Sequence, residues 1–205
     1  MLFRSSLLSV PWLYDLAQFV MRGTRYRRNL AETHLKVSPG DRVLDIGCGT
    51  GAMLECLPEL VPPVQYVGFD MSPAYIAAAR RNYPGRGQFY PLELTGRTVA
   101  DFGEFDRVLA IGLVHHLDDP AAVNLFTLAQ QALRPGGKLI TLDGVFTPNQ
   151  SWLVKRLLKS DRGKHVRTES EYLALARGAF RQVETFVSAD LFRIPYTTLI
   201  MECTP

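Results

Sequence analysis

Short apolar runs recur along the chain, and segments with apolar residues at helical intervals separate them. Runs of this length between turn residues are typical of buried strands. Five strands are predicted in this way: one that ends at Asp45, and then 65–70, 88–92, 105–111 and 138–143. Because strands and helices alternate, the pattern predicts a parallel sheet with helices on both faces and right-handed crossovers.

Helix caps support the helical periodicity. Ser72 and Pro73 mark one helix start, since serine is a favoured N-cap and proline suits the first helical position. Asp119 and Pro120 mark another start in the same way. Helices are predicted over 12–35, as two helices interrupted at Gly23, and over 52–57, 74–82, 120–133, 151–158 and 169–176.

The last part of the chain has the alternation of half-buried strands. Apolar and polar residues alternate over 183–187 and again over 196–202, with Pro195 between the two stretches. This pattern predicts a terminal antiparallel pair. The fold class is therefore α/β, with a doubly wound seven-stranded sheet that is mostly parallel, a C-terminal antiparallel strand, and helices on both faces.

The strand that ends at Asp45 leads into residues 47–51, whose sequence is GCGTG. Glycine has no Cβ, so it reaches positive φ at little cost and lets a ligand approach the main chain closely. A helix that starts at Ala52 would direct its free N–H groups and its positive end toward such a ligand. The loop therefore indicates a nucleoside-cofactor site. Its G-x-G-x-G spacing differs from the dinucleotide pattern G-x-G-x-x-G.

Composition narrows the class of protein. The 205 residues suffice for one domain with a sizeable core, and 47% hydrophobic with 21% charged residues is close to the average for soluble globular proteins. The net charge is +3, and the cations are not gathered into one run, so no nucleic-acid partner is expected. Four arginines over 22–28 are interpreted as a solvated helix face in preference to a membrane-surface patch.

The cysteines and the start of the chain bear on location. Cys48, Cys56 and Cys203 have neither metal-ligand spacing nor the density of a disulfide scaffold, so reduced thiols in a cytoplasmic protein are expected. Residues 1–21 are apolar but interrupted by polar residues, and no small-residue cleavage site follows. They are predicted to pack as a helix on their own domain, with shallow membrane contact as the alternative.

The glycine loop is one of several motifs that occur in order along the chain. The others are an acid at the end of the second strand, Asp70, an acid after the third, Glu93, FDRVLAIGLVHHL at 105–117, and LRPGGKLIT at 133–141. Together with VLDIGCGTG at 43–51 they resemble the class I S-adenosylmethionine-dependent methyltransferases, in the small-molecule branch with an H-H-L signature.

The resemblance covers nearly the whole chain and extends loosely to the quinone C-methyltransferases through Tyr14, Asp15 and residues 23–28. It implies a single Rossmann-like domain over 1–205. Within it, residues 1–36 would form N-terminal capping helices, 37–145 the cofactor-binding core, and 146–205 the acceptor-side helices and terminal strands.

The resemblance also implies S-adenosyl-L-methionine as cofactor. Asp45 would attract the ammonium group of the cofactor, and the carboxylate of the cofactor would lie near the loop N–H groups. Asp70 would take the ribose hydroxyls, Met71 would lie against the adenine, and Glu93 would accept from the adenine amino group. Gly51 would let the following helix pack closely. The implied cofactor-binding residues are Asp45, Gly47, Cys48, Gly49, Gly51, Asp70, Met71, Glu93, Leu94 and Ile111. A purely structural role for each acid remains the alternative.

Histidines supply the candidate acid–base groups. His115 and His116 are neighbours, so at most one is expected to face the site. Two adjacent imidazoles seldom bind one ion, so no metal site is expected. For His116, packing and a role as general base both stay open. His165, in the basic loop 161–167, and Tyr14 are the other candidate bases.

The reaction implied is in-line transfer of a methyl group to a small-molecule or lipid-like acceptor, which leaves S-adenosylhomocysteine. Trp152, Leu153 and Leu157 favour an apolar acceptor, while Arg162 and Lys164 suit an anionic end. Two other functions stay open: a regulatory protein that binds the cofactor without turnover, and a nicotinamide-dependent oxidoreductase. Either a monomer or a homodimer is compatible with the sequence.

Overall fold

The structure of this protein, a computed structural model, describes residues 25–160, 163–189, 191 and 196–205. Its strands are β1 (Arg42–Ile46), β2 (Gln65–Phe69), β3 (Gln88–Tyr90), β4 (Phe105–Ile111), β5 (Leu133–Phe146), β6 (Arg167–Thr168), β7 (Gln182–Ser188) and β8 (Thr198–Thr204). Its helices are α2 (Arg25–Leu30), the π-helical turn η2 (Ala31–Leu35), the 3₁₀ turns η3 (Leu54–Cys56) and η4 (Val114–His116), α3 (Pro73–Asn82), α4 (Gly96–Phe102), α5 (Asp119–Gln131), α6 (Trp152–Ser160) and α7 (Glu169–Ala176).

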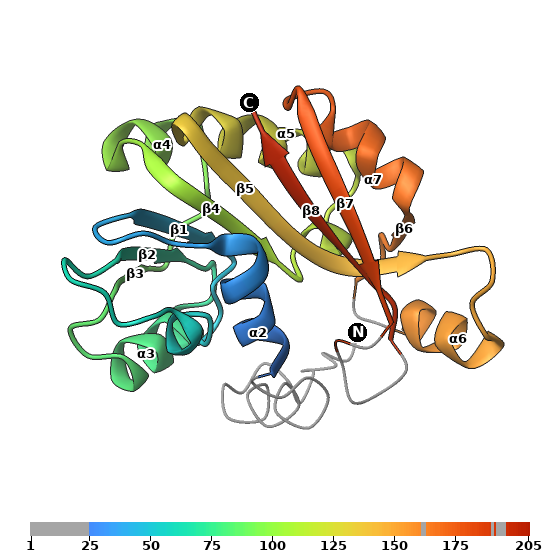
Figure 1. Cartoon of the computed structure of the whole chain (residues 1–205), viewed down its shortest axis with the longest axis horizontal. Coiled ribbons are helices and arrows are strands. Elements are labelled where there is room, and N and C mark those ends of the chain that lie inside the picture. Colours follow the sequence, from blue (N-terminus) through green and yellow to red (C-terminus); the bar gives the residue numbers. More distant parts are fainter. Residues whose placement is uncertain (1–24, 161–162, 190, 192–195) are drawn as a thin grey trace, which may run out of the picture.

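Seven strands form one path through the sheet in the order β3-β2-β1-β4-β5-β8-β7, and β6 pairs with β5 beside this path. β1 pairs in parallel with β2 and β4, and β5 pairs in parallel with β4. β8 runs antiparallel to both β5 and β7. The predicted mixed sheet with its antiparallel C-terminal pair is therefore confirmed (Figure 1).

Helices cover both faces of the sheet, as predicted. On one face α4, α5 and α7 pack over a core cluster that includes Phe126 and Tyr172. On the other face α2, α3 and α6 pack over a cluster that includes Leu30, Ile76 and Leu158. Figure 1 shows the two sets of helices on opposite sides of the strands. This double cover explains why the central strands are nearly continuous apolar runs.

The segment after the glycine loop differs from its prediction. Residues 52–57 form only the 3₁₀ turn η3 and no α-helix. Leu57 is already extended, with ψ at 138°, and Pro58 follows it. A residue before proline is disfavoured in the helical region, and so few residues cannot repay helix nucleation.

The sequence interpretation missed α4 and shortened β5. α4 begins with a capping box between Thr95 and Thr98, but none of its residues is buried, so it lacks the apolar periodicity of a helix. The predicted turn at 134–137 belongs to β5, because Leu133 already pairs with Phe105 before a register shift in the ladder. The first helix predicted within 12–35 lies outside the described residues.

The predicted cap of α5 is wrong by one residue. Asp118 is the N-cap, and its Oδ1 accepts the N–H of Ala121 at 3.0 Å. Asp119 is the first helical residue, and its Oδ1 instead accepts from the guanidinium of Arg167 at 2.7 Å. The cap of α3 is as predicted, with Ser72 Oγ accepting from the N–H of Tyr75 at 3.4 Å.

Gly68 in β2 gives a test of the packing behind the glycine loop. A Cβ there would lie 2.8 Å from Cys48 Sγ and 2.9 Å from the Phe89 ring, so we expect Gly68→Ala to lower the free energy of unfolding by about 1–3 kcal/mol. Urea denaturation measures this change. Gly96→Ala is the matched control, because nothing lies within 4 Å of a Cβ at that position. Equal stability of the two variants would contradict the packing described.

Candidate cofactor and acceptor site

Two acids at the ends of adjacent strands define the candidate cofactor site. Asp45 lies in β1 opposite Gly68 of β2, and Asp70 follows β2 directly. Asp70 joins the two loops: its Oδ2 accepts the N–H of Gly49 at 3.0 Å, and its Oδ1 accepts the N–H of Ser72 at 2.8 Å. The Asp70 carboxylate is therefore held against the glycine loop and the start of α3.

The glycine loop needs glycine for both conformation and space. Gly47, Gly49 and Gly51 have φ values of +74°, +56° and +80°. A Cβ on Gly51 would lie 2.9 Å from the Phe89 ring, and one on Gly47 would lie 3.3 Å from the Leu113 side chain. Gly51 therefore permits close packing against β3, where the sequence had suggested packing of a following helix.

The N–H groups of this loop donate within the protein. Gly47 and Cys48 both donate to the carbonyl oxygen of Phe69, at 2.7 and 2.9 Å, and Gly49 donates to Asp70. No α-helix follows whose N-terminus would add further donors. The three glycines thus leave backbone exposed, the Cys48 and Thr50 side chains of the loop are buried, and the charge of the site comes from its acids.

Asp45 is the buried acid of the site. Its side chain accepts a hydrogen bond from the Tyr66 hydroxyl, and the residue is 2% exposed. Burial raises the pKa of Asp45 to about 7, against the lowering effect of the Tyr66 hydrogen bond. The charge of Asp70 raises this pKa further, whereas Arg27 lowers it. Asp45 therefore sits where a positively charged ligand group would favour its ionised form.

The other predicted cofactor residues lie in different environments. Met71 is 72% exposed, beside Asp70 in the chain, and Glu93 is exposed on the segment before α4. Ile111 at the end of β4 is half-buried. Cys48 is buried, and Leu94 packs into the core beneath α4 and α5, so the Leu94 side chain belongs to the core.

A buried histidine–carboxylate pair lies at the ends of β4 and β5. His115 Nδ1 is 2.7 Å from Asp143 Oδ1, and the backbone N–H of His115 donates to the same oxygen at 3.1 Å. His115 is 2% exposed, and Gly163 lies so close to its ring that a Cβ there would overlap it. Asp143 Oδ2 is buried and has no hydrogen-bond partner among the described residues. The pair fixes the orientation of the imidazole.

The three predicted bases are placed differently. His116 is exposed, and its ring centroid lies 4.3 Å from that of His115. His165 is half-buried, and its N–H donates to the His115 carbonyl oxygen at 2.9 Å. Tyr14 lies outside the described residues. The two neighbouring histidines thus differ in exposure although their rings lie together, and the loop of His165 bonds to the His115 backbone.

Arg167 holds this part of the site together. Its Nη2 donates to the Leu117 carbonyl oxygen at 2.7 Å, and its Nη1 donates to the His165 carbonyl oxygen at 2.9 Å. Its bond to Asp119 adds the start of α5. Carbonyl oxygens at the end of η4 thereby receive hydrogen bonds, and the turn with His115 and His116 is fixed relative to the loop with His165.

Sequence interpretation missed Asp143 and Tyr66, and it favoured His116 over His115 as a base. A signal for Asp143 was present, because it ends a predicted parallel strand just as Asp45 and Asp70 do. Tyr66 carried no signal, since its hydroxyl meets Asp45 only through strand pairing.

Within the described residues, no group of three or more His, Cys, Asp and Glu side chains is arranged to hold a metal ion. In the same part of the chain, every helix is too short or too polar to cross a lipid bilayer.

Comparison with known proteins finds similarity to methyltransferases. A family profile described as "Methyltransferase domain" matches residues 43–137, which include the glycine loop and β1 to β4. Acetylserotonin O-methyltransferase of Mus musculus is 30% identical over 166 residues, covering 74% of this chain and 42% of that protein. Demethylmenaquinone methyltransferase of Thermus thermophilus is 32% identical over 123 residues, covering 58% of this chain and 54% of that protein.

A solved structure shows the same fold. Human N-acetylserotonin methyltransferase in complex with SAM superimposes with a TM-score of 0.70 at 18% identity, covering 99% of this chain and 58% of that chain. This chain spans about half the length of the curated relatives named above.

The fold and the site define a Rossmann-like protein built to bind a nucleoside cofactor at the carboxyl ends of its parallel strands. The profile match over residues 43–137 and the two curated relatives support a class I S-adenosylmethionine-dependent methyltransferase. The solved structure of human N-acetylserotonin methyltransferase holds SAM.

The raised pKa of Asp45 predicts a pH-dependent stability. Between its ordinary pKa of 3.8 and the folded value of about 7, the native state keeps a proton that the unfolded chain releases. The stabilisation is complete below pH 3.8 and is lost as the pH rises to about 7, with a slope of at most about 1.4 kcal/mol per pH unit. We expect Asp45→Asn to remove this slope in urea denaturation between about pH 5 and 8.

Asp101→Asn is the control for this measurement, because Asp101 is an exposed acid in α4. Its stability curve should run parallel to that of the parent protein. A curve for Asp45→Asn that is also parallel to the parent would show that Asp45 is ionised throughout this range.

Proposed function

We propose that this protein transfers a methyl group from S-adenosylmethionine to a small-molecule or lipid-like acceptor. The observation that carries the proposal is the pair of acids, Asp45 and Asp70, set beside a loop of three glycines with positive φ. A buried acid suits the ammonium group, and a carboxylate at the end of the second strand suits ribose hydroxyls. The residues present therefore fit the cofactor.

The chain's contribution to this reaction is placement. When bound, the cofactor supplies an electrophilic methyl carbon on a sulfonium. Asp45 and Asp70 would fix the two polar ends of the cofactor, and the three glycines of the loop would let it lie close to the sheet. Methyl transfer then needs an acceptor atom held in line with that carbon, in a site from which water is excluded.

His115, whose ring is oriented by a carboxylate, is the residue that we assign to removing a proton from an oxygen or carbon acceptor. With Nδ1–H donating to Asp143 Oδ1, Nε2 carries the lone pair and is the basic atom. Asp143 would act as the positioning residue, and its second oxygen is free to accept from the acceptor or to stabilise the protonated ring. This arrangement favours His115 over His116 and His165, which lie next to it.

The acceptor side would be formed by residues 146–205 together with the N-terminal helices. The loop that carries His165 already contacts the His115 backbone, which brings the segment after β5 to the ends of β4 and β5. The relatives' names, acetylserotonin and demethylmenaquinone methyltransferases, indicate a small, largely apolar acceptor with an ionisable atom. The division of the chain into 1–36, 37–145 and 146–205 is proposed on this basis.

Cofactor affinity tests the proposal directly. We expect isothermal titration of the full chain to detect S-adenosylmethionine binding, and we expect Asp70→Asn to weaken it about tenfold or more, through the loss of charge-assisted hydrogen bonds worth about 1.5–3 kcal/mol. Asp101→Asn should bind as the parent does. Binding that is absent in the parent, or equal in both variants, would contradict the assignment of this site.

The base is tested by turnover with methyl-labelled cofactor and N-acetylserotonin or demethylmenaquinol as probe acceptors. We expect His115→Gln to lower kcat about 100-fold or more, with cofactor affinity unchanged, since a general base contributes about 10²–10⁴. His116→Gln is the matched control and should retain most of the activity. The reverse order would assign the proton transfer to His116. Tight cofactor binding without product in cell extract would instead favour the regulatory alternative.

A further inference from the structure

The outer face of α6 carries two large apolar side chains that the described residues leave exposed. Trp152 is 74% exposed and Leu153 is 44% exposed. The inner face of the same helix is fully used, because Leu158 is buried and Val154 packs against the core cluster shared with α2 and α3. The exposed tryptophan therefore takes no part in packing α6 against the core. Tryptophan is enriched at membrane–water interfaces, because its ring is apolar while its indole N–H can donate a hydrogen bond.

Cations surround these apolar residues, and α6 contains no acid. Lys155, Arg156 and Lys159 all belong to this helix. The helical repeat places Trp152, Arg156 and Lys159 on one stripe, since residues three, four and seven apart share a face. None of the three cations has an ion-pair partner among the described residues. The face is therefore both apolar and positively charged.

A pocket of about 650 Å³ adjoins this helix. Its apolar walls come from the end of β5, the segment after it and α7, with Phe146, Pro148 and Leu173. Lys155 and Lys159 line its α6 side, opposite the single carboxylate of Glu169, which accepts a hydrogen bond from Thr185 at 2.6 Å. An apolar recess with two cations at its side has the shape and charge that suit an anionic lipid headgroup with part of its chain.

We propose that the outer face of α6, with the adjoining pocket, binds the surface of a bilayer that contains anionic phospholipid. Basic residues and a tryptophan on one short amphipathic helix are the features that dock a protein in the interface without spanning the membrane. Figure 1 shows α6 beyond the end of β5, at the outer edge of the molecule, where a flat surface can approach it. The binding needs neither cofactor nor acceptor, so it stands independently of the proposed reaction.

The experiment uses the full chain with Trp12→Phe, which leaves Trp152 as the only tryptophan. Vesicles of phosphatidylglycerol with phosphatidylcholine are compared with vesicles of phosphatidylcholine alone, in the absence of cofactor. We expect co-sedimentation and a blue shift of Trp152 emission with the anionic vesicles only, quenching by brominated lipid, and weakening as salt is raised.

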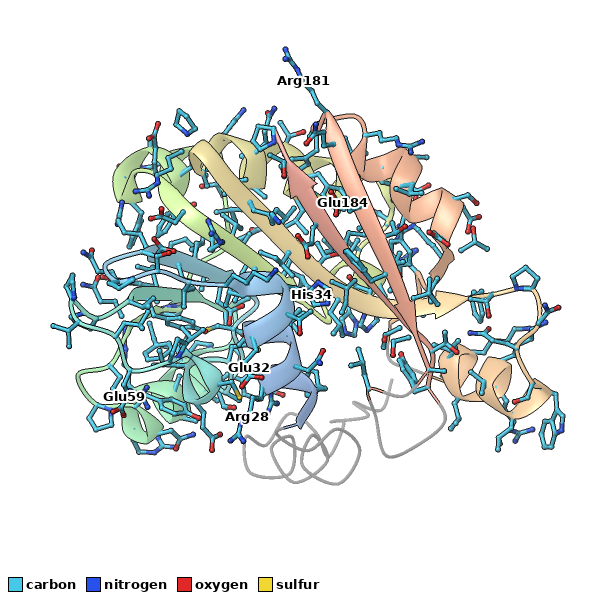
Figure 2. The ribbon with its side chains drawn as sticks, viewed as in Figure 1. Arg28, Glu32, His34, Glu59, Arg181 and Glu184 are labelled. Atoms are coloured by element: carbon cyan, nitrogen blue, oxygen red, sulfur yellow. The ribbon has the colours of Figure 1, made fainter. Side chains whose placement is uncertain are left out.

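Two substitutions locate the binding on α6. Lys155→Gln with Lys159→Gln should weaken partition into anionic vesicles roughly 25-fold, at about fivefold for each cation removed. The matched control is Arg97→Gln with Arg181→Gln, which removes two exposed cations elsewhere; Figure 2 shows Arg181 at the opposite edge of the molecule. Trp152→Ala should weaken partition without changing its salt dependence. Circular dichroism confirms that each variant is folded.

Three outcomes would overturn the proposal. The first is equal partition into neutral and anionic vesicles. The second is the same affinity in the α6 double variant and the control, which would move any binding to another surface. The third is a blue shift of equal size with monomeric dihexanoyl-phosphatidylglycerol, which would show a pocket for a single anionic amphiphile and no membrane surface.

Discussion

The parallel pairing of β1 with β2 and β4 is the constraint on which the candidate site depends. Parallel strands end at the same edge of a sheet, so every loop that follows them opens onto one crevice. Asp45 lies near the end of β1, Asp70 follows β2, and Asp143 lies in β5 directly after the last residue that pairs with β4. The same pairing places the glycine loop between the two acids nearest it. Without this register, the acids would be three unrelated surface charges.

Two neighbouring acids make the candidate site negatively charged. Asp45 is held out of water and close to a second carboxylate, and only the Tyr66 hydroxyl and the more remote Arg27 offset this cost. A site with two neighbouring acids favours a ligand with a positive charge, because that charge relieves the repulsion between the two carboxylates. The loop amides, which already donate within the protein, do not compete with that preference.

Long-range polar contacts fix the loops around the crevice. Arg167 joins the histidine turn, the basic loop and the start of α5 through carbonyl oxygens and Asp119. On the other side of the sheet, Glu202 of β8 accepts from Lys138 and bonds His34, which secures the end of η2. The bonds of Arg167 to Asp119 and of His34 to Glu202 join segments more than forty positions apart in the chain, whereas Trp152 of α6 stays exposed.

The sequence by itself determined the succession of strands along the chain and most helix starts. Apolar runs and caps such as Ser72 are local signals that the fold keeps. The sequence also placed Asp45, Asp70 and the glycine loop at the carboxyl ends of neighbouring strands, since apolar runs that end in an acid or in glycines are local patterns. Only the tertiary structure decided that Tyr66 bonds Asp45, that Asp143 orients His115 and that Asp119 serves Arg167. Each of these contacts joins side chains through strand pairing or loop packing, which no local pattern encodes.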